Sequence, residues 1–231
     1  MFYDMHIHSA LSPCAMDDMS CNNVVNMALL KGLELISVTD HNSMAQQRMM
    51  AETALKAGLR YICGAEVQTR EEVHVLSYFT EIVKAEAFGS WIVSVRQHFP
   101  NNPHFFGNQL LFNADDEVIG HEDDCLIFSL EASLEEVIDS IHRFSGKAVL
   151  AHIIDRKNGV MSQLGFIPKD LPYDGLEVTK PEQIDKVLKL HPWINDPIFF
   201  MNSDAHTLID ISEAEHNIEE TTWNKFWGYQ R

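Results

Sequence analysis

The first residues of the chain alternate apolar side chains with groups that bind metal ions. The metal-binding groups are Asp4, His6 and His8. Residues two apart in a β-strand face the same side, so a strand over residues 2–8 carries one carboxylate and two imidazoles on a single face. Unpaired polar groups are costly to bury, and a bound metal ion is the simplest partner for this set. Imidazole and carboxylate together suit Zn, Mn or Fe, so the strand predicts part of a metal site.

Similar side chains follow other apolar runs farther along the chain. They are Asp40, His41, Glu66, His152, Asp204 and His206. The carboxyl ends of parallel strands meet at one edge of a sheet, and functional residues gather there. His74 differs from the others because it lies inside its predicted strand. The recurrence of such groups at strand ends predicts that they converge on one metal cluster.

Strands and helices are predicted to alternate through most of the chain. The expected strands are 2–8, 33–39, 60–63, 72–79, 147–151, 175–178 and 198–201. The expected helices are 20–31, 43–57, 81–98, 135–144, 181–190 and a short one after residue 209. This alternation indicates an α/β fold with a mainly parallel sheet, either open or closed into a barrel. Residues 99–124 have no clear period, so we expect an irregular insert or lid there, with a hairpin around 118–121.

The composition indicates one acidic domain over residues 1–231. Hydrophobic residues make up 45% of the chain, which is enough for a sizeable core. The chain has 34 acidic and 17 basic residues and a formal charge of −17, which argues against a basic surface that holds duplex nucleic acid. Bound divalent cations reverse the local sign of the charge, so a phosphate-ester substrate is not excluded.

The cysteines and the remaining histidines suggest little further chemistry. The four cysteines have no CxxC spacing, so neither a zinc ribbon nor a redox pair is expected. Cys14 follows the first histidines, either as a ligand or as an incidental loop thiol. Five other histidines are expected on the surface: His98, His104, His121, His142 and His191. No apolar run of about 18 residues or signal peptide is evident, so we expect a soluble cytoplasmic protein without a membrane span.

Taken in order, the motifs resemble those of the PHP (polymerase and histidinol phosphatase) family, in particular its stand-alone metal-dependent phosphoesterases. They are Asp4-Met-His6-Ile-His8, Thr39-Asp40-His41, Gly64-Ala65-Glu66-Val67, His74, Ala151-His152 and Ser203-Asp204-Ala205-His206. The resemblance covers residues 4–206. It implies a distorted (β/α)7 TIM-like barrel and a site for two or three divalent metal ions, such as Mn, Zn or Fe.

The resemblance also implies which residues hold each metal. The first set is His6, His8, Glu66 and Asp204; the second is Glu66, His74 and His152; the third includes His41 and His206. Asp4 and Asp40 are expected to orient the imidazoles through hydrogen bonds. Family members usually have a further ligand of the third metal where this chain has Pro13 and Cys14. We expect Asp17 or Asp18 to turn back and replace it, with Cys14 or an empty third site as the other options.

The implied activity is that of a metal-dependent phosphoric ester hydrolase. Metals a few ångströms apart bridge a hydroxide that attacks the phosphorus, and the catalytic groups are Glu66, Asp204 and His206. Arg156 is expected to bind the outer phosphate oxygens, with Lys157 and Lys180 as weaker candidates.

The expected substrate is a small phosphate ester, either a nucleotide or a short oligonucleotide, without stable binding of duplex nucleic acid. Three alternatives remain at this point: a histidinol-phosphate-type phosphatase, a metal-dependent amidohydrolase acting on a C–N bond, and a non-catalytic metal-binding sensor module. The sequence leaves the physiological substrate, the native metal and the oligomeric state open.

Overall fold

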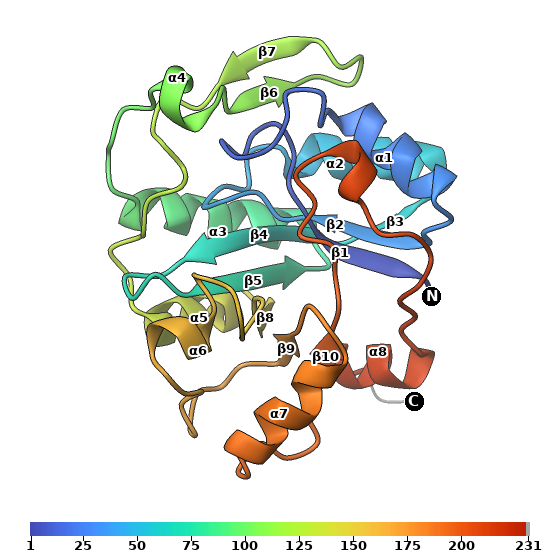
Figure 1. Ribbon diagram of the computed structural model, residues 1–231. Helices are drawn as coiled ribbons and strands as arrows, with labels where there is room; N and C mark the ends of the chain where they lie inside the picture. The colour runs from blue at the N-terminus through green and yellow to red at the C-terminus, as the bar shows by residue number, and fades with distance from the viewer. Residues whose placement is uncertain (230–231) are drawn as a thin grey trace.

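The computed structural model describes residues 1–229, in which helices surround β-sheets (Figure 1). The strands are β1 Tyr3–Ile7, β2 Leu35–Val38, β3 Arg60–Tyr61, β4 Cys63–Gln68, β5 His74–Phe79, β6 Leu110–Phe112, β7 Val118–His121, β8 Lys147–Leu150, β9 Gly175–Glu177 and β10 Phe199–Phe200. The helices are α1 Cys21–Leu30, α2 Gln47–Ala57, α3 Ile82–Val95, α4 Pro103–Phe106, α5 Leu134–Arg143, α6 Val160–Gln163, α7 Glu182–Leu190 and α8 Glu220–Trp227, with a 3-10 turn, η1, at Leu208–Asp210.

The strands form two main sheets that meet at their edges. One sheet has the order β1-β2-β3 and the other the order β10-β9-β8-β5-β4. An isolated bridge from Ile7 to Ala205 joins β1 to the chain beyond β10, and another from His41 to Glu66 joins the chain after β2 to β4. The predicted α/β class is confirmed. A closed barrel is not, because in the described residues only single bridges connect the two sheets at these points.

Strand β5 runs antiparallel to both of its neighbours, β4 and β8. The sheet is therefore mixed rather than mainly parallel. The antiparallel direction explains the position of His74, which pairs with Gln68 at the carboxyl end of β4. His74 is the first residue of its strand, so it lies at the same edge as the strand-end residues of the parallel strands.

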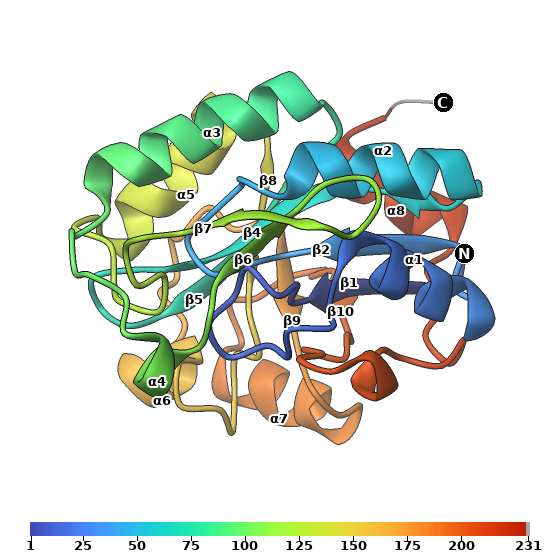
Figure 2. The same cartoon turned by 90° about the horizontal axis from the view of Figure 1, so that it is seen from above.

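Buried side chains from both sheets and from α8 form one core cluster that includes several aromatic rings. The Phe226 ring of α8 packs edge-on against Phe200 of β10, with 5.0 Å between ring centroids. The buried Tyr78 hydroxyl donates a hydrogen bond to the Met5 carbonyl at 2.7 Å. The carboxy-terminal helix thus completes the core. Helices α2 and α3 cover one side of the sheets and α7 lies on the other (Figure 2).

Local sequence explains where several helices begin and end. Ser133 and Glu136 form a capping box at the start of α5, since each side chain bonds the backbone N–H of the other. Gly58 ends α2 in the left-handed conformation at φ 77°. Helix α2 begins at Gln47, after a turn, rather than at residue 43. Helix α6 was not predicted, because it is a single short turn inside a polar segment.

The irregular insert contains the short helix α4 and the ribbon β6–β7, which confirms the expected hairpin (Figure 1). The insert packs on the loop that follows β1. The Leu110 N–H donates to the Ala10 carbonyl at 2.7 Å, and the Asn108 amide donates to Asp17 at 2.7 Å. Across residues 1–229, none of the helices has the length and apolar character needed to cross a bilayer.

Candidate metal centre

Glu66 is the centre of a cluster of five imidazoles. Its carboxylate is buried, with 1% of the side chain exposed. The nitrogens nearest its two oxygens are His6 Nε2 at 3.3 Å, His8 Nε2 at 3.5 Å, His41 Nδ1 at 3.1 Å, His74 Nδ1 at 2.7 Å and His152 Nε2 at 3.0 Å. A single carboxylate cannot neutralise or fully hydrogen-bond so many imidazoles, so the set is arranged for additional positive partners.

Separate elements of the fold deliver these side chains to one place. His6 comes from β1, Glu66 from β4 and His74 from the start of β5. The others lie in the segments directly after β1, β2, β8 and β10, and they are His8, His41, His152, Asp204 and His206. The structure therefore brings together the eight histidine, glutamate and aspartate residues that the family resemblance assigned to the three metal positions. Two of them have left-handed backbones that non-glycine residues seldom adopt: His152 at φ 25° and Asp204 at φ 55°. Such conformations concentrate at functional sites.

Asp204 and Glu66 both lie at ligand spacing from the same two imidazole nitrogens. Asp204 Oδ1 lies 3.4 Å from His6 Nε2 and 3.3 Å from His8 Nε2. Glu66 Oε1 lies 3.3 Å from His6 Nε2, and Glu66 Oε2 lies 3.5 Å from His8 Nε2. Ligands about 2.1 Å from a tetrahedral ion are roughly 3.4 Å apart, which matches these separations. Neither nitrogen has a hydrogen-bond partner within residues 1–229, although both are buried.

Three overlapping groups of ligand atoms lie within 4.8 Å of one another. They are His6, His8 and Glu66; His41, Glu66 and His74; and His8, Cys14, His41 and His206. Buried imidazoles with unpaired nitrogens cost free energy unless a cation binds them. The residues present therefore fit a cluster of divalent metal ions that shares Glu66.

Glu177 orients His6 from the side of the ring remote from Glu66. It was not predicted from the sequence. Its two oxygens lie 3.1 Å from His6 Nδ1, and they also accept hydrogen bonds from the His152 backbone N–H at 2.7 Å and the Asn202 amide at 2.6 Å. Because the carboxylate accepts from Nδ1–H, the His6 Nε2 lone pair faces the cluster. Glu177 is the last residue of β9, so the strand-end rule that identified the other residues also applied to it.

Asp40 supports His8 through a serine. Its oxygens accept hydrogen bonds from Ser9 and from the Ser12 hydroxyl, the latter at 2.7 Å. With its proton donated to Asp40, the Ser12 oxygen accepts from His8 Nδ1 at 3.0 Å. This relay fixes the His8 tautomer with Nε2 unprotonated and turned toward Glu66.

Asp4 does not orient an imidazole, which corrects the sequence-based expectation. Its carboxylate accepts hydrogen bonds from the Ser203 hydroxyl at 2.6 Å, the Ser203 N–H at 3.2 Å and the Ser212 N–H at 2.9 Å. Ser203 directly precedes Asp204. Asp4 therefore holds the backbone that carries Asp204 rather than a histidine ring.

The electrostatics of the cluster favour a positive charge beside its carboxylates. Burial lowers the pKa of His8 to about 3, and the neighbouring His41 adds to the effect, so this imidazole is neutral. Burial alone would raise the pKa of Glu66, but the surrounding histidines, chiefly His74 and His6, hold it well below its usual range. Burial would lower the pKa of His6, yet nearby carboxylates, led by Glu177, raise it well above its ordinary value. The carboxylates are thus ionised and attract positive charge.

A cavity of about 250 Å³ opens onto the cluster. Arg156, Lys157 and Asn158 line it, so two of the expected cations lie at the site, while Lys180 is not part of the lining. Asp17 and Asp18 are exposed and are not in the cluster either, because Asp17 instead pairs with Asn108 of the insert. The expectation that an aspartate turns back into the site is therefore not met. Cys14 lines the cavity in its place.

Gly107 allows the backbone of the insert to pack closely against the loop that carries Cys14. A Cβ at this position would overlap the Pro13 carbonyl oxygen, and the backbone has φ 99°. We expect Gly107→Ala to lower the free energy of unfolding by about 1–3 kcal/mol, because it adds both strain and a clash. Chemical denaturation measures the change. Gly165→Ala is the matched control, with φ 81° and open space around the Cβ, and an equal loss in both variants would contradict the role given to the Pro13 contact.

Among the other histidines, His191 departs from expectation. It is buried rather than on the surface, because Nε2 accepts from the Ile167 N–H at 3.0 Å and Nδ1 bonds the Val187 carbonyl at 3.0 Å. His142 is partly buried and pairs with Asp174 at 2.8 Å. His98, His104 and His121 are exposed, as expected.

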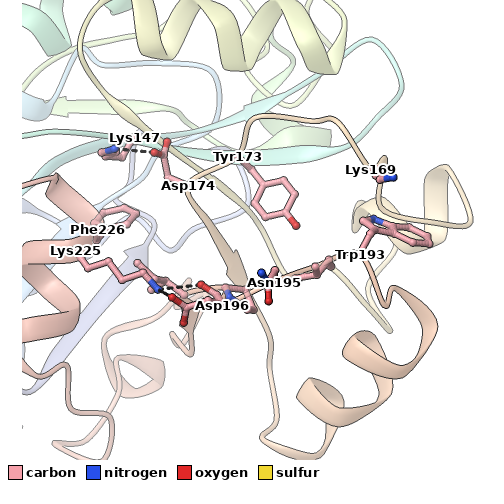
Figure 3. Close-up of a pocket in the computed structure, with 12 residues that line it drawn as sticks. Lys147, Lys169, Tyr173, Asp174, Trp193, Asn195, Asp196, Lys225 and Phe226 are labelled. Atoms are coloured by element: carbon pink, nitrogen blue, oxygen red, sulfur yellow. Dashed lines mark hydrogen bonds and ion pairs between the residues drawn. The ribbon is translucent and has the colours of Figure 1, made fainter.

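A second cavity, of about 380 Å³, lies at the opposite, amino ends of β8, β9 and β10 (Figure 3). Two of its three lysines are paired with acidic groups, Lys147 with Asp174 at 2.7 Å and Lys225 with Asp196 at 2.5 Å, and the third, Lys169, is exposed. This lining contains no histidine, unlike that of the first cavity. The chemistry therefore belongs to the cluster around Glu66.

Solved structures share the fold at low sequence identity. A Bifidobacterium adolescentis protein described as a candidate metal-dependent phosphoesterase is 18% identical, with a TM-score of 0.64 over 97% of this chain and 94% of its own. A Chromobacterium violaceum amidohydrolase, solved with bound sulfate and no metal, is 16% identical, with a TM-score of 0.61 over 99% and 96%. The lesion-specific endonuclease Q of Pyrococcus furiosus is 19% identical, with a TM-score of 0.61 over 89% of this chain. This chain spans only 48% of that endonuclease.

Comparison with curated protein sequences found no match. The family model of the PHP domain, however, matches residues 4–161, which is more than half of the chain. That segment contains the first histidine motif, Glu66, His74 and His152, and the fold adds Asp204 and His206 to them. The family resemblance seen in the sequence is confirmed. The chain belongs to the PHP domain family.

Proposed function

We propose that this protein is a metal-dependent phosphoesterase acting on a small phosphate ester. The observation that carries the proposal is the buried Glu66 carboxylate among five imidazoles, two of which, His6 and His8, have unpaired Nε2 atoms. This donor set binds divalent cations, and its cavity carries Arg156 and Lys157 at the side where an anion would enter. A metal cluster with cations at its entrance is suited to a phosphoryl group.

The ligand roles follow the contacts. His6, His8, Glu66 and Asp204 hold one ion, and Glu66 with His74 and His152 holds a second. Mn, Zn or Fe bound there would lower the pKa of a coordinated water and offset the charge of the phosphate. Glu177 fixes the His6 imidazole, and the Asp40–Ser12 pair fixes the His8 imidazole, in the tautomer that metal binding requires. His206 is half-buried at the cavity, where it can hold a further ion or a proton for the leaving oxygen.

The substrate class is less restricted by the site. The charge of −17 disfavours long contacts with nucleic-acid backbones, so we propose a nucleotide or a short oligonucleotide. Endonuclease Q has been solved with a 27-mer duplex that carries an abasic lesion at its active site. A duplex substrate therefore belongs among those to be tried. A ligating lysine would favour amide hydrolysis, and none of the strand-end residues that form the cluster is a lysine.

The direct test is a phosphate-release screen of the Mn-loaded protein. The substrates are p-nitrophenyl phosphate, nucleoside 3′,5′-bisphosphates, histidinol phosphate, short oligonucleotides and a duplex with an abasic site, alongside a small amide panel. Turnover of a nucleotide or oligonucleotide supports the proposal. Turnover confined to histidinol phosphate or amides, or none with any ester, contradicts it.

Arg156 is expected to bind the phosphate. We expect Arg156→Ala to raise KM about tenfold or more with little change in kcat, because a charge-assisted hydrogen bond contributes roughly 1.5–3 kcal/mol. Steady-state kinetics on the best ester of the screen measures both constants. Lys180→Ala is the control, since Lys180 is exposed but does not line the cavity. Equal KM values for the two variants would exclude Arg156 from binding.

A further inference from the structure

The thiol of Cys14 lies among imidazoles at the edge of the cluster. Its sulfur and nitrogens of His8, His41 and His206 all fall within 4.8 Å of one another. The loop that carries it is fixed on two sides. The Met16 N–H donates to the His206 carbonyl at 3.0 Å, and Gly107 of the insert packs against the carbonyl of Pro13. The sulfur is therefore held beside the rings rather than carried on a free loop.

His41 connects the Cys14 group to the positions around Glu66, since it belongs to a ligand group with each of them. The residue is only 5% exposed, and its Nδ1, which lies 3.1 Å from a Glu66 oxygen, has no hydrogen-bond partner in the described part of the chain. His8 is committed elsewhere, because Nδ1 bonds Ser12 and Nε2 faces Glu66 and Asp204. The members of the cluster that the two metal positions around Glu66 do not use are Cys14, His41 and His206.

These three donors differ chemically from the rest of the cluster. The positions around Glu66 combine imidazole with carboxylate oxygen, which Mn, Fe and Zn all accept. A thiolate with two imidazoles is a softer set, and three protein ligands with an open fourth position are typical of reactive zinc sites.

We infer that Cys14, His41 and His206 form a separate, zinc-selective site beside the two positions that share Glu66. The inference rests on the proposed metal-dependent function and deepens it. It predicts a mixed-metal centre, in which zinc occupies the thiolate position even when Mn or Fe fills the others.

Cobalt substitution tests the thiolate directly. Metal-free protein is loaded with Co(II), and the absorption spectrum is recorded for the wild type, Cys14→Ser, Cys14→Asp and the control Cys63→Ala, which removes a buried thiol that belongs to none of the ligand groups. The wild type and Cys63→Ala are expected to show a thiolate-to-cobalt charge-transfer band, and both Cys14 variants to lose it. A wild type without the band, or a Cys14→Ser variant that keeps it, overturns the inference.

Metal counting by mass spectrometry, with Zn and Mn in competition, tests selectivity. The wild type is expected to retain one equivalent of zinc that Cys14→Ser lacks. In Cys14→Asp that equivalent is expected to become manganese, because an oxygen ligand suits the harder ion. Equal zinc contents in all three proteins contradict the inference. Ester hydrolysis without the charge-transfer band would contradict the Cys14 site and support the proposed function. The band without hydrolysis of any ester would support the Cys14 site and contradict the proposed function.

Discussion

Replacing Glu66 by glutamine is expected to reduce kcat/KM for the best phosphate ester about a thousandfold. Glu66 lies within 3.5 Å of nitrogens from five histidines, and an amide can neither supply the negative charge nor bridge two ions as a carboxylate does. Bound metals contribute several kcal/mol of charge stabilisation, and about 1.4 kcal/mol corresponds to a factor of ten in rate. Elemental analysis of the same preparation should show a loss of bound metal.

The matched control for this change is Glu52→Gln, at an exposed position of α2. It should retain wild-type kinetics and metal content. Circular dichroism checks that both variants are folded. If the folded Glu66→Gln protein kept full activity, Glu66 would not be the shared ligand of the centre.

Replacing Glu177 is expected to cost both stability and metal affinity. All three partners of its carboxylate are donors: His6 Nδ1, the His152 N–H and the Asn202 amide. Glu177→Ala leaves them buried and unpaired, so we expect the free energy of unfolding to fall by about 3 kcal/mol. Glu177→Gln keeps the shape but turns an NH2 group toward at least one donor. Because such supporting groups orient metal ligands, we expect a 10–100-fold loss of metal affinity, roughly the effect seen for comparable groups elsewhere.

Denaturant titration and competition with a metal chelator measure these two effects. The control is Glu182→Gln, an exposed glutamate in the first turn of α7. Unchanged metal affinity in a folded Glu177→Gln protein would show that Glu177 has only a packing role. A loss of stability without a loss of affinity would lead to the same conclusion.

Much of the site could be predicted because most of its metal-binding residues lie at or directly after the ends of strands. Period-two alternation placed His6 and His8 on one face, and polar residues after apolar runs identified His41, Glu66 and His152. The same rule applied to Glu177, but it was hidden inside the predicted strand 175–178. A strand boundary error of one residue was enough to make a terminal position look internal.

Two features could not be predicted because they depend on tertiary contacts. The direction of β5, which brings His74 to the cluster, is set by pairing with β4 and β8 and not by local pattern. Contacts with the insert explain why Cys14, and not Asp17, lies at the cluster. Asn108 of the insert bonds Asp17, and Gly107 packs against the carbonyl of Pro13. The meeting of the two sheets at isolated bridges, rather than in a closed barrel, likewise depends on contacts between distant segments.

The proposed function depends most directly on the link between bound metal and ester hydrolysis. Metal-free protein should be titrated with Mn(II) while bound metal and phosphate release from p-nitrophenyl phosphate are measured in the same samples. We predict no release without metal and a rise in rate as the positions around Glu66 fill, with at least two ions bound per chain. Fewer than two ions at saturation, or an equal rate from the metal-free protein, would contradict the account.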